Sequence, residues 1–375
     1  MATHSKTSAK ASIYAWRCVY IIAIVAAIAT KVSCDDTKAI PADRSQVNAW
    51  FEANVLPLSQ RKGTLDAVLE AAELKARVIK VRQDGTGDFK TINQAIASIP
   101  VGNKQRVILN IGPGIYNEKI LIPKTKPFIF LAGTPGAEPI LQFGATAKQV
   151  GTFNSATLIV FSDYFKASFL IIKNTTPRPN ADQAKSGAQA VALRLSGDKA
   201  AIYSCKIYGF QDTLLDESGR HFFKSCFIQG TIDFIFGSGK SLYLQTELHV
   251  IDEKWKTVIA AQAKQEKNED SGFSFVHCAI SGVGVSDTYL ARAWMSWSDV
   301  VYSYSTISKA VLPEGWESSG KPVGNMLFGE FQNTGPGANV AGRVKFSTRL
   351  SPTAAKRYLT LGYIEASQWL LQPIS

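Results

Sequence analysis

One pattern recurs in three successive stretches, SGDKAAIYSCKIYG (196–209), SGRHFFKSCFIQG (218–230) and SGKSLYLQTELHV (238–250). In this pattern Cys205, Cys226 and Thr246 fall in one column, 21 and 20 residues apart, and SGFSFVHCAI (271–280) adds a further copy with Cys278. A period of about 20 residues built from short strands predicts one solenoid coil per repeat. The LxxLxL consensus of leucine-rich repeats is missing, so the pattern favours a parallel β-helix.

Short β-rich runs precede these repeats, with few helical patterns between them. The runs are VILNI (107–111), KILI (119–122), FIFLAG (128–133), ATLIVFS (156–162), FLIIKN (169–174) and VALRLSG (191–197). We therefore predict an all-β solenoid body over residues 78–375.

Helices are expected only around this body. The lead-in, residues 35–77, has a helical pattern near its end but is too short to be a domain, so it is predicted as an N-terminal helical cap. TINQAIASI (91–99) begins with a capping residue, Thr91, and is stopped by proline. Near the C-terminus, Ser351 followed by Pro352 predicts a helix that continues for about two turns.

The first residues have the pattern of an export signal. Lysine and arginine residues precede the apolar run CVYIIAIVAAIA (18–29), and small and polar residues follow up to Cys34. Twelve apolar residues are few for a bilayer span. We predict a signal peptide over residues 1–34 and a secreted protein, with a retained anchor as the open alternative. An exported chain could be glycosylated at Asn174 in the sequon NTT (174–176), for which an unmodified loop is the alternative.

The chain is basic, with a formal net charge of +11. Residues 1–34 contain four lysine or arginine residues and no aspartate or glutamate, so a mature chain that begins near Asp35 keeps a formal net charge of +7. A basic exported protein suits an acidic partner such as nucleic acid, anionic lipid or an acidic polysaccharide. Nucleic acid ranks low, because the lysines and arginines are scattered and no RNP-like, zinc-finger or helix-turn-helix pattern is present.

Two aspartates stand inside apolar and aromatic runs, where burying a carboxylate is costly. Asp212 lies in GFQDTL (209–214) and Asp233 in DFIFG (233–237), 21 residues or one repeat period apart. Equivalent residues of stacked coils lie about 4.8 Å apart, so we expect both carboxylates on one outer face. Two close carboxylates cannot both ionise freely, which predicts a proton-holding acid beside a charged nucleophile. Two ordinary turn aspartates are the alternative.

Amide, cationic and aromatic side chains complete the candidate site. Gln211 adjoins Asp212, and Gln189 precedes Gln211 by 22 residues, about one coil, so two amide donors could stabilise a developing oxyanion. Arg292 could orient one carboxylate through its fork of donors, and Trp294 offers a flat face for a sugar ring. For these last two, a surface arginine and a core tryptophan remain the alternatives.

Six motifs, in order, resemble those of the pectin methylesterases, the carbohydrate esterases that remove methyl groups from pectin. They are DGTGDFKTI (84–92), GIYNEK (114–119), QAVALR (189–194), GFQDTL (209–214), DFIFG (233–237) and GPGA (335–338). The resemblance covers about residues 78–345. It implies a right-handed parallel β-helix with its cleft on one outer face, which agrees with the repeat found independently.

The resemblance also carries catalytic roles to matching positions. Asp233 would attack the carbonyl carbon of the methyl ester. Asp212 would protonate the departing methoxide and then act as base for the water that releases the acyl-enzyme. Gln211 would help hold the oxyanion, and Gln189 would support the same region.

Around these groups, the resemblance implies that Arg292 hydrogen-bonds the nucleophile and keeps it ionised. Phe210 and Phe234 would form walls near the substrate, with core packing as the alternative. No cofactor and no metal are implied. The substrate would be methyl-esterified homogalacturonan of the plant cell wall, a proteinaceous pectinesterase inhibitor is a candidate partner, and we expect a monomer. Residues 35–77 are too few for the inhibitor-like pro-domain of many plant members, so this is predicted to be the short form.

The chain departs from the family pattern in two places. Residues 290–294 are LARAW where the family usually has LGRPW, which frees different backbone angles at a presumed turn and puts substrate fit or turnover in doubt. Thr246 replaces the usual cysteine, so Cys278 lacks its usual partner. A disulfide between Cys205 and Cys226 and three buried free thiols are then the two alternatives.

Other enzyme classes fit the sequence less well. A serine esterase would need a GxSxG motif, which is absent, and the four histidines belong to no recognisable triad. A pectate lyase would need grouped calcium-binding carboxylates, and a polygalacturonase would need an acid pair without neighbouring amides. Outside the enzymes, an inactive wall-binding protein that keeps the cleft is the alternative.

Overall fold

The computed structural model describes Met1 and residues 36–179, 187–251, 255–282 and 287–373. The described residues from Asp36 onward belong to one compact unit. The predicted signal peptide lies outside the described residues. Within the described ranges, no helix is long and apolar enough to cross a membrane.

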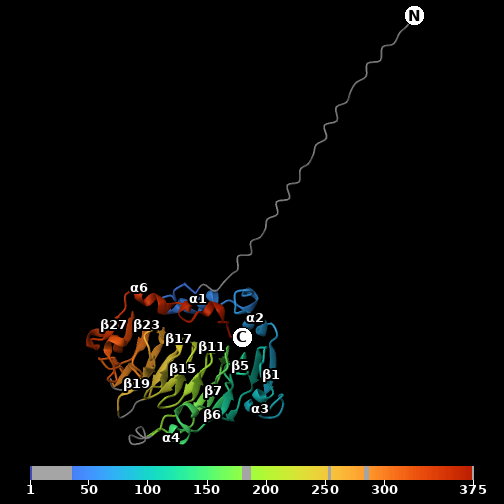
Figure 1. Cartoon of the computed structure of the whole chain (residues 1–375), viewed down its shortest axis with the longest axis horizontal. Coiled ribbons are helices and arrows are strands. Elements are labelled where there is room, and N and C mark those ends of the chain that lie inside the picture. Colours follow the sequence, from blue (N-terminus) through green and yellow to red (C-terminus); the bar gives the residue numbers. More distant parts are fainter. Residues whose placement is uncertain (2–35, 180–186, 252–254, 283–286, 374–375) are drawn as a thin grey trace. The chain divides into compact units, whose positions relative to one another are not determined.

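The paired strands of this unit run parallel in three sheets, and the chain visits the sheets in turn (Figure 1). Each coil passes from the first sheet to the third, then to the second, and back to the first one coil further on. The predicted all-β, right-handed parallel β-helix is confirmed.

The first sheet, called the wide sheet, has 11 strands. In spatial order they are β1 (Arg77–Val81), β2 (Val107–Ile111), β5 (Ile129–Ala132), β8 (Lys166–Ser168), β11 (Ala200–Tyr203), β14 (Arg220–Lys224), β17 (Lys240–Leu244), β20 (Gly272–Val276), β23 (Ser298–Ser303), β26 (Met326–Phe331) and β27 (Ser347–Arg349).

The second and third sheets have 8 strands each among the described residues. The second sheet contains β4 (Ile120–Ile122), β7 (Leu158–Val160), β10 (Leu193–Leu195), β13 (Leu214–Asp216), β16 (Ile235–Gly237), β19 (Thr257–Gln262), β22 (Thr288–Ala293) and β25 (Trp316–Glu317). The third sheet contains β3 (Ile115–Asn117), β6 (Ile140–Phe143), β9 (Ile171–Asn174), β12 (Lys206–Tyr208), β15 (Phe227–Gly230), β18 (Glu247–Val250), β21 (Ala279–Gly282) and β24 (Thr306–Ile307).

The α-helices are short. In the part of the chain that the structure describes they are α1 (Val47–Asn54), α2 (Ala67–Glu73), α3 (Ile92–Ala97), α4 (Ala147–Val150) and α6 (Pro352–Ala355). The predicted caps of two of them are confirmed, because Thr91 Oγ1 accepts from the Gln94 amide and Ser351 Oγ accepts from the Ala354 amide, each at 3.2 Å. After α6 the chain tightens into a 3₁₀ turn, Lys356–Leu359.

A single left-handed residue turns each coil from the wide sheet into the third sheet. Ser204, Ser225, Gln245 and His277 occupy this position in four coils, with φ between 49° and 55°. The residues that follow them are Cys205, Cys226, Thr246 and Cys278, which form one column of the repeat, and all four are buried in the interior. One repeat of the sequence therefore corresponds to one coil of the β-helix, and the side chains of the cysteine column face the interior.

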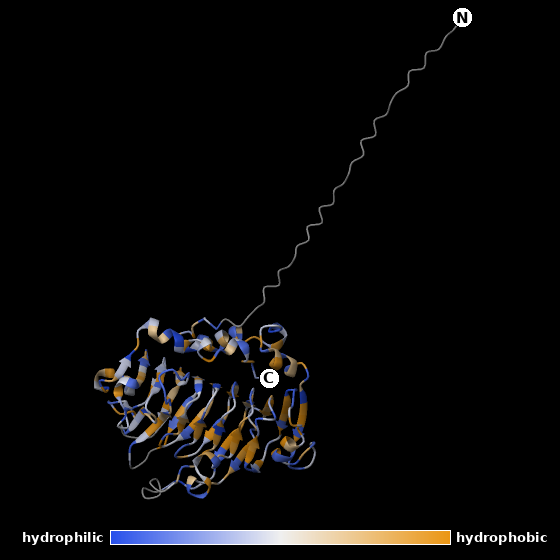
Figure 2. Ribbon diagram, viewed as in Figure 1, coloured by the Kyte–Doolittle hydropathy of each residue, from blue (hydrophilic) through white to orange (hydrophobic). Residues whose placement is uncertain are grey.

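Two hydrophobic layers hold the unit together. One fills the interior of the coils, and Figure 2 shows many hydrophobic residues, in orange, along the strands. The other lies on the outer face of the wide sheet, where the N-terminal segment (residues 36–76) and the C-terminal segment (residues 350–371) pack together, as around Phe51, Phe222 and Trp369. Residues 36–76 are thus part of the folded unit and cover the outer face of the wide sheet.

A buried ionic cluster lies inside the coils. His221 Nδ1 is 2.5 Å from Asp216 Oδ1, and His221 Nε2 is 2.8 Å from the Gly197 carbonyl oxygen. Tyr243 donates its hydroxyl to Asp216 Oδ2 at 2.5 Å. Both ring nitrogens face oxygen acceptors, so His221 is held as an imidazolium. Burial lowers the pKa of His221, but the Asp216 carboxylate outweighs this and raises the pKa above its usual range.

We expect this cluster to make stability depend on pH. A raised histidine pKa stabilises the fold fully below the unfolded value of 6.5, and the contribution is lost as pH rises through the folded value. His221→Gln should lower the free energy of unfolding by about 3–5 kcal/mol, because it leaves the Asp216 carboxylate buried without its cation. Tyr243→Phe, which keeps the ion pair, should cost about 1–2 kcal/mol.

Urea unfolding of the three proteins at acidic and alkaline pH tests this. The gap between the unaltered protein and His221→Gln should narrow as pH rises. A gap that widens with pH would contradict an imidazolium at this position.

Candidate active site

The two predicted aspartates occupy equivalent places in adjacent coils. β13 pairs with β16 so that Leu214 faces Ile235, which puts Asp212 and Asp233, each two residues earlier, in register. The Asp212 amide donates to the Ile232 carbonyl at 3.0 Å. Both aspartates have left-handed backbones, with φ of 64° and 50°, in the turn that leads from the third sheet into the second. The predicted proximity on one face is present.

Asp233 is tied to a cation, as predicted. Its carboxylate is 1% exposed, and Arg292 Nε donates to Oδ1 at 2.7 Å while Nη2 donates to Oδ2. Arg292 reaches it across β19, where the intervening outward residue is the small Ala261. The Arg292 guanidinium is therefore half-buried in a bidentate pair and is not a free surface group.

Asp212 has no such partner. Five carboxylate residues of the described ranges are buried, namely Glu73, Asp212, Asp216, Asp233 and Glu330. The other four accept side-chain hydrogen bonds from arginine, histidine, tyrosine or tryptophan. Among the described residues, no side chain bonds the Asp212 carboxyl, which is 4% exposed.

The different surroundings separate the two aspartates electrostatically. Burial and the neighbouring Asp233 charge raise the pKa of Asp212 well above its usual range. Burial also raises the pKa of Asp233, but the Arg292 hydrogen bonds and charge oppose that rise. The stronger opposition at Asp233 assigns the shared negative charge to it and the proton to Asp212.

Gln189 and Gln211 come from neighbouring coils, joined by the bond from the Ala190 amide to the Gln211 carbonyl at 3.2 Å. The side-chain oxygen of each glutamine is buried without a hydrogen-bond partner among the described residues. Buried amides are normally paired, and unpaired ones in a native fold call for an explanation. An amide oxygen accepts hydrogen bonds, so the groups that could bind a substrate oxyanion are the Nε2 donors of the two glutamines, which have no hydrogen-bond partner among the described residues.

The predicted aromatic residues separate into two groups. Trp294 is 43% exposed, and the Arg292 guanidinium lies 5.4 Å from its ring centre, so it is a surface ring beside the site. Phe210 is half-buried in the turn before Asp212. Phe234 is 0% exposed and packs in the interior, so its prediction as a substrate wall is wrong. Phe234 packs against Gly230. A larger residue does not fit at position 230, because its Cβ would collide with Phe234 and would lie 2.6 Å from the Phe210 carbonyl oxygen.

An apolar patch beside the aspartates was not predicted. Leu215, Phe236 and Ala261 point outward from three adjacent strands of the second sheet and pack with Val191 and Ile159. Strand alternation could have found them, because their neighbours Leu214, Ile235 and Ala260 face the interior. Leu215, Phe236 and Ala261 are at most 5% exposed, so the patch is a small packed cluster beneath this face and not an open substrate surface.

The LARAW stretch forms a strand, not a turn. Residues 290–293 belong to β22, and Ala291 and Ala293 are buried in the interior. The ladder continues past it, because the Trp294 amide donates to the Gln262 carbonyl at 3.0 Å. An extended strand needs neither the glycine nor the proline of the family pattern, and Arg292 still faces outward.

Of the two alternatives for the cysteines, the structure has three buried free thiols, Cys205, Cys226 and Cys278, and not a disulfide between Cys205 and Cys226. Residues stacked in register on parallel strands have parallel Cα–Cβ bonds, whereas a disulfide needs them to converge. Burial raises the pKa of Cys226 and of Cys278 to about 12, so neither thiol is reactive. Thr246 fits the same column, with its hydroxyl bonded to the Leu244 carbonyl at 3.5 Å.

The predicted glycosylation of Asn174 conflicts with its burial. The side chain is 3% exposed, and Nδ2 donates to the carbonyls of Ala145, Ser155 and Val191 at 3.0, 3.2 and 2.9 Å. Thr176 Oγ1 donates to Asn174 Oδ1 at 2.7 Å. The sequon is a structural asparagine turn, and a glycan on Nδ2 would break all three carbonyl bonds.

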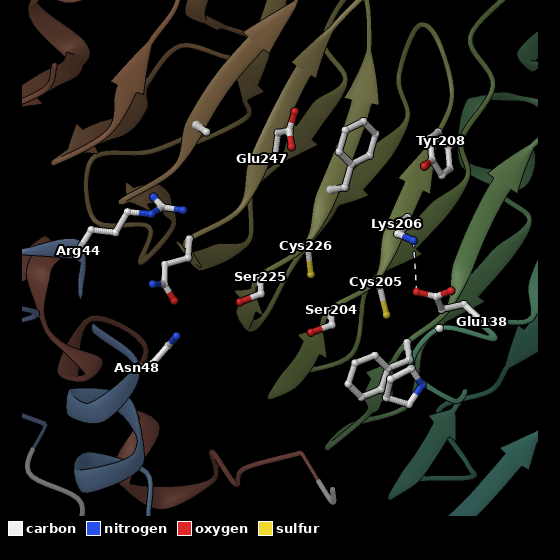
Figure 3. A pocket seen from close by; sticks show the side chains of 16 residues that line it. Arg44, Asn48, Glu138, Ser204, Cys205, Lys206, Tyr208, Ser225, Cys226 and Glu247 are labelled. Carbon is white, nitrogen blue, oxygen red and sulfur yellow. Dashed lines mark hydrogen bonds and ion pairs between the residues drawn. The ribbon is translucent and has the colours of Figure 1, made fainter. Parts of the chain in front are cut away.

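A groove lies away from the aspartates, at the turn between the wide and third sheets (Figure 3). Its volume is about 630 Å³, and its lining includes Ser204, Ser225, Phe227 and the ion pair of Lys206 with Glu138, whose atoms are 3.2 Å apart. None of the predicted catalytic residues lines it. In the described ranges, no group of three or more His, Cys, Asp or Glu side chains is arranged to hold a metal ion.

A parallel β-helix that carries a charged aspartate beside a protonated one, with free amides next to them, has the parts of a carboxylic ester hydrolase. The pectinesterase family model matches residues 78–367. The chain belongs to the pectinesterase family and is an esterase.

Individual relatives agree. The chain is 51% identical to "Probable pectinesterase 49" of Arabidopsis thaliana over 91% of this chain and 94% of that protein. It is 50% identical to "Pectinesterase 2" of Olea europaea over 91% and 93%. Among solved structures, the pectin methylesterase from carrot superimposes with a TM-score of 0.70 at 31% identity, over 79% of this chain and 97% of the other.

Removal of the Asn174 amide should destabilise the fold. Asn174→Ala removes three hydrogen bonds to buried carbonyls and leaves that of Ser155 without a partner, so we expect the free energy of unfolding to fall by at least about 2 kcal/mol. Thr176→Ala destroys the same sequon but keeps the three bonds, so its loss should be smaller. Mass spectrometry of the protein secreted from a plant host should find Asn174 unmodified, and a glycan there would contradict the buried arrangement.

Proposed function

We propose that this protein demethylates methyl-esterified homogalacturonan to pectate and methanol, with Asp233 as nucleophile and Asp212 as acid and base. The observation that carries the proposal is the contrast between two stacked aspartates, one clamped by Arg292 and the other without a cation. Such a contrast assigns one carboxylate to attack and the other to proton transfer.

In the first half-reaction, a carboxylate oxygen of Asp233 attacks the ester carbonyl carbon. Arg292 uses one lone pair on each Asp233 oxygen, which leaves another for the attack. The negative charge that develops on the carbonyl oxygen is received by the amides of Gln211 and Gln189. The C–O bond to the methoxy group then breaks, and Asp212 donates its proton to form methanol and the acyl-enzyme.

In the second half-reaction, the same groups act in reverse. Asp212, now a carboxylate, takes a proton from water as the water oxygen attacks the acyl carbon. The bond to Asp233 breaks, the uronic acid is released, and Asp233 recovers its charge opposite Arg292. One ester and one water give one acid and one methanol, and the aspartates return to their starting protonation.

Features around the aspartates support an acidic polysaccharide as substrate. The basic chain attracts a polyanion. Trp294 offers an exposed ring for stacking against a sugar. The carrot relative is named a pectin methylesterase, which favours ester removal over the chain cleavage of a polygalacturonase or a pectate lyase.

We also infer that the protein acts outside the cell, in the cell wall. This inference rests on the basic and apolar pattern of residues 1–34 and on the substrate class. A proteinaceous pectinesterase inhibitor is the partner expected from the family, and the catalytic unit is expected to be a monomer.

Methanol release from highly methylated pectin, with polymer length followed in parallel, tests the reaction. Asp233→Asn should lower kcat by at least about a thousandfold, since it removes the nucleophile. Asp270→Asn, an exposed aspartate in the loop before β20, serves as the matched control and should keep full rate. Full activity of Asp233→Asn, or a fall in polymer length, would refute the mechanism.

The pH profile of kcat should be bell-shaped. Activity requires an ionised Asp233 and a protonated Asp212, and the pKa of each is raised above the usual aspartate range. Rate should therefore fall on the acidic side as Asp233 takes up a proton and on the alkaline side as Asp212 loses one. Steady-state methanol assays across pH give the profile. An acid-side loss without any alkaline fall would remove Asp212 from the role of acid.

A further inference from the structure

Arg292 stands between two carboxylates along the axis of the coils. Asp233 lies on one side and accepts both guanidinium bonds. On the other side β22 pairs with β25, and the register puts Arg292 directly beside Glu317. Trp316 next to it is buried in the interior, so strand alternation turns Glu317 outward onto the face that carries Arg292.

The backbone that presents Glu317 is firmly held. Trp316 stacks on Phe328 with ring centres 4.9 Å apart, and its Nε1 donates to Glu330 Oε1 at 3.2 Å. Just before it, the Gly315 carbonyl accepts from the Leu290 amide at 2.7 Å. Glu317 is thus fixed in place as the last outward residue of the second sheet in the described ranges.

The Glu317 carboxylate is not used by another contact. Among the described residues, none hydrogen-bonds or ion-pairs with it. Its charge acts on the site through space. Burial and Arg292 govern the pKa of Asp233, and Glu317 raises that pKa further. The same charge contributes to the raised pKa values of Arg292 and Lys256.

The proposed reaction creates a charge next to this arginine. The methyl ester is neutral, but the product is a uronate carboxylate, which matches a guanidinium as well as Asp233 does. If nothing offset the charge of Arg292, the guanidinium would bind the product carboxylate. The product would then compete with Asp233 for Arg292. A fixed carboxylate on the far side of Arg292 offsets part of this field and repels the product.

We propose that Glu317 is a positioning residue that balances Arg292, so that the arginine orients Asp233 without retaining the anionic product. The inference rests on the proposed function. It assigns to Glu317 a role in product release and in the acidic limit of activity, while leaving the chemical step to the two aspartates.

Glu317→Gln tests the inference, because it removes the charge and keeps the shape. Inhibition of methanol release by de-esterified oligogalacturonate should become about threefold stronger, the scale of one partly exposed charge pair. The acidic limb of kcat should move to lower pH, because Glu317 raises the pKa of Asp233. A structural role alone would change stability but neither of these readouts, and Glu317→Asp should restore both.

Glu314→Gln is the matched control, since Glu314 is exposed on the turn before Trp316 and has no register partner at Arg292. Equal effects of the two variants, or no effect of Glu317→Gln, would overturn the inference. If the unaltered protein released no methanol, the proposed function would fail by itself. Calorimetric binding of oligogalacturonate to the unaltered protein and to both variants would then still decide whether Glu317 repels the acid.

Discussion

The fold depends on the hydrogen-bond register between parallel strands of successive coils. Because Leu214 pairs with Ile235, Ile235 with Ala260 and Ala291 with Trp316, each chemical group has a fixed place relative to the next coil. A shift by one residue would turn every outward side chain inward. The same register that packs the interior therefore sets the separation of Asp212 from Asp233, and no loop has to position them.

The turns show how far the site is a property of the coil. A left-handed backbone at a non-glycine residue is unusual, and such strain often marks function. Ser204 and Ser225, which have no catalytic place, have it in the turn from the wide sheet into the third sheet. In the turn from the third sheet into the second, Asp212 and Asp233 are the only non-glycine residues among those described that have it. The left-handed backbone is therefore a repeated feature of the first turn and is confined to the two aspartates in the second. Asp tolerates the left-handed region better than most residues, which makes this turn suitable for a carboxylate.

Much of this arrangement was readable from the sequence, because it follows from periodicity. The cysteine column and the aspartate pair were found by counting one repeat, and the helix caps by local hydrogen-bond chemistry. The contacts of Phe234 and Asn174 were not readable, since each depends on which face the backbone turns inward at an irregular turn. Strand alternation could have identified Phe236 as the outward aromatic residue next to Phe234.

The covering of the wide sheet by both ends of the chain depends on contacts between residues some 300 positions apart, such as Arg61 with Leu370, and no local pattern reveals these.

Asp212 differs from the other buried carboxylates of the described residues in how the cost of its burial is offset. An isolated buried carboxylate is costly, and the fold meets that cost with a partner at Glu73, Asp216, Asp233 and Glu330. At Asp212 the cost is met by a proton, because the neighbouring charge on Asp233 and the loss of water favour the neutral form. A neutral carboxyl costs less to bury than a charged one, and it can also donate its proton. In the proposed mechanism, the lack of a bonded cation at Asp212 among the described residues is what would let one coil period supply both an acid and a nucleophile from the same residue type.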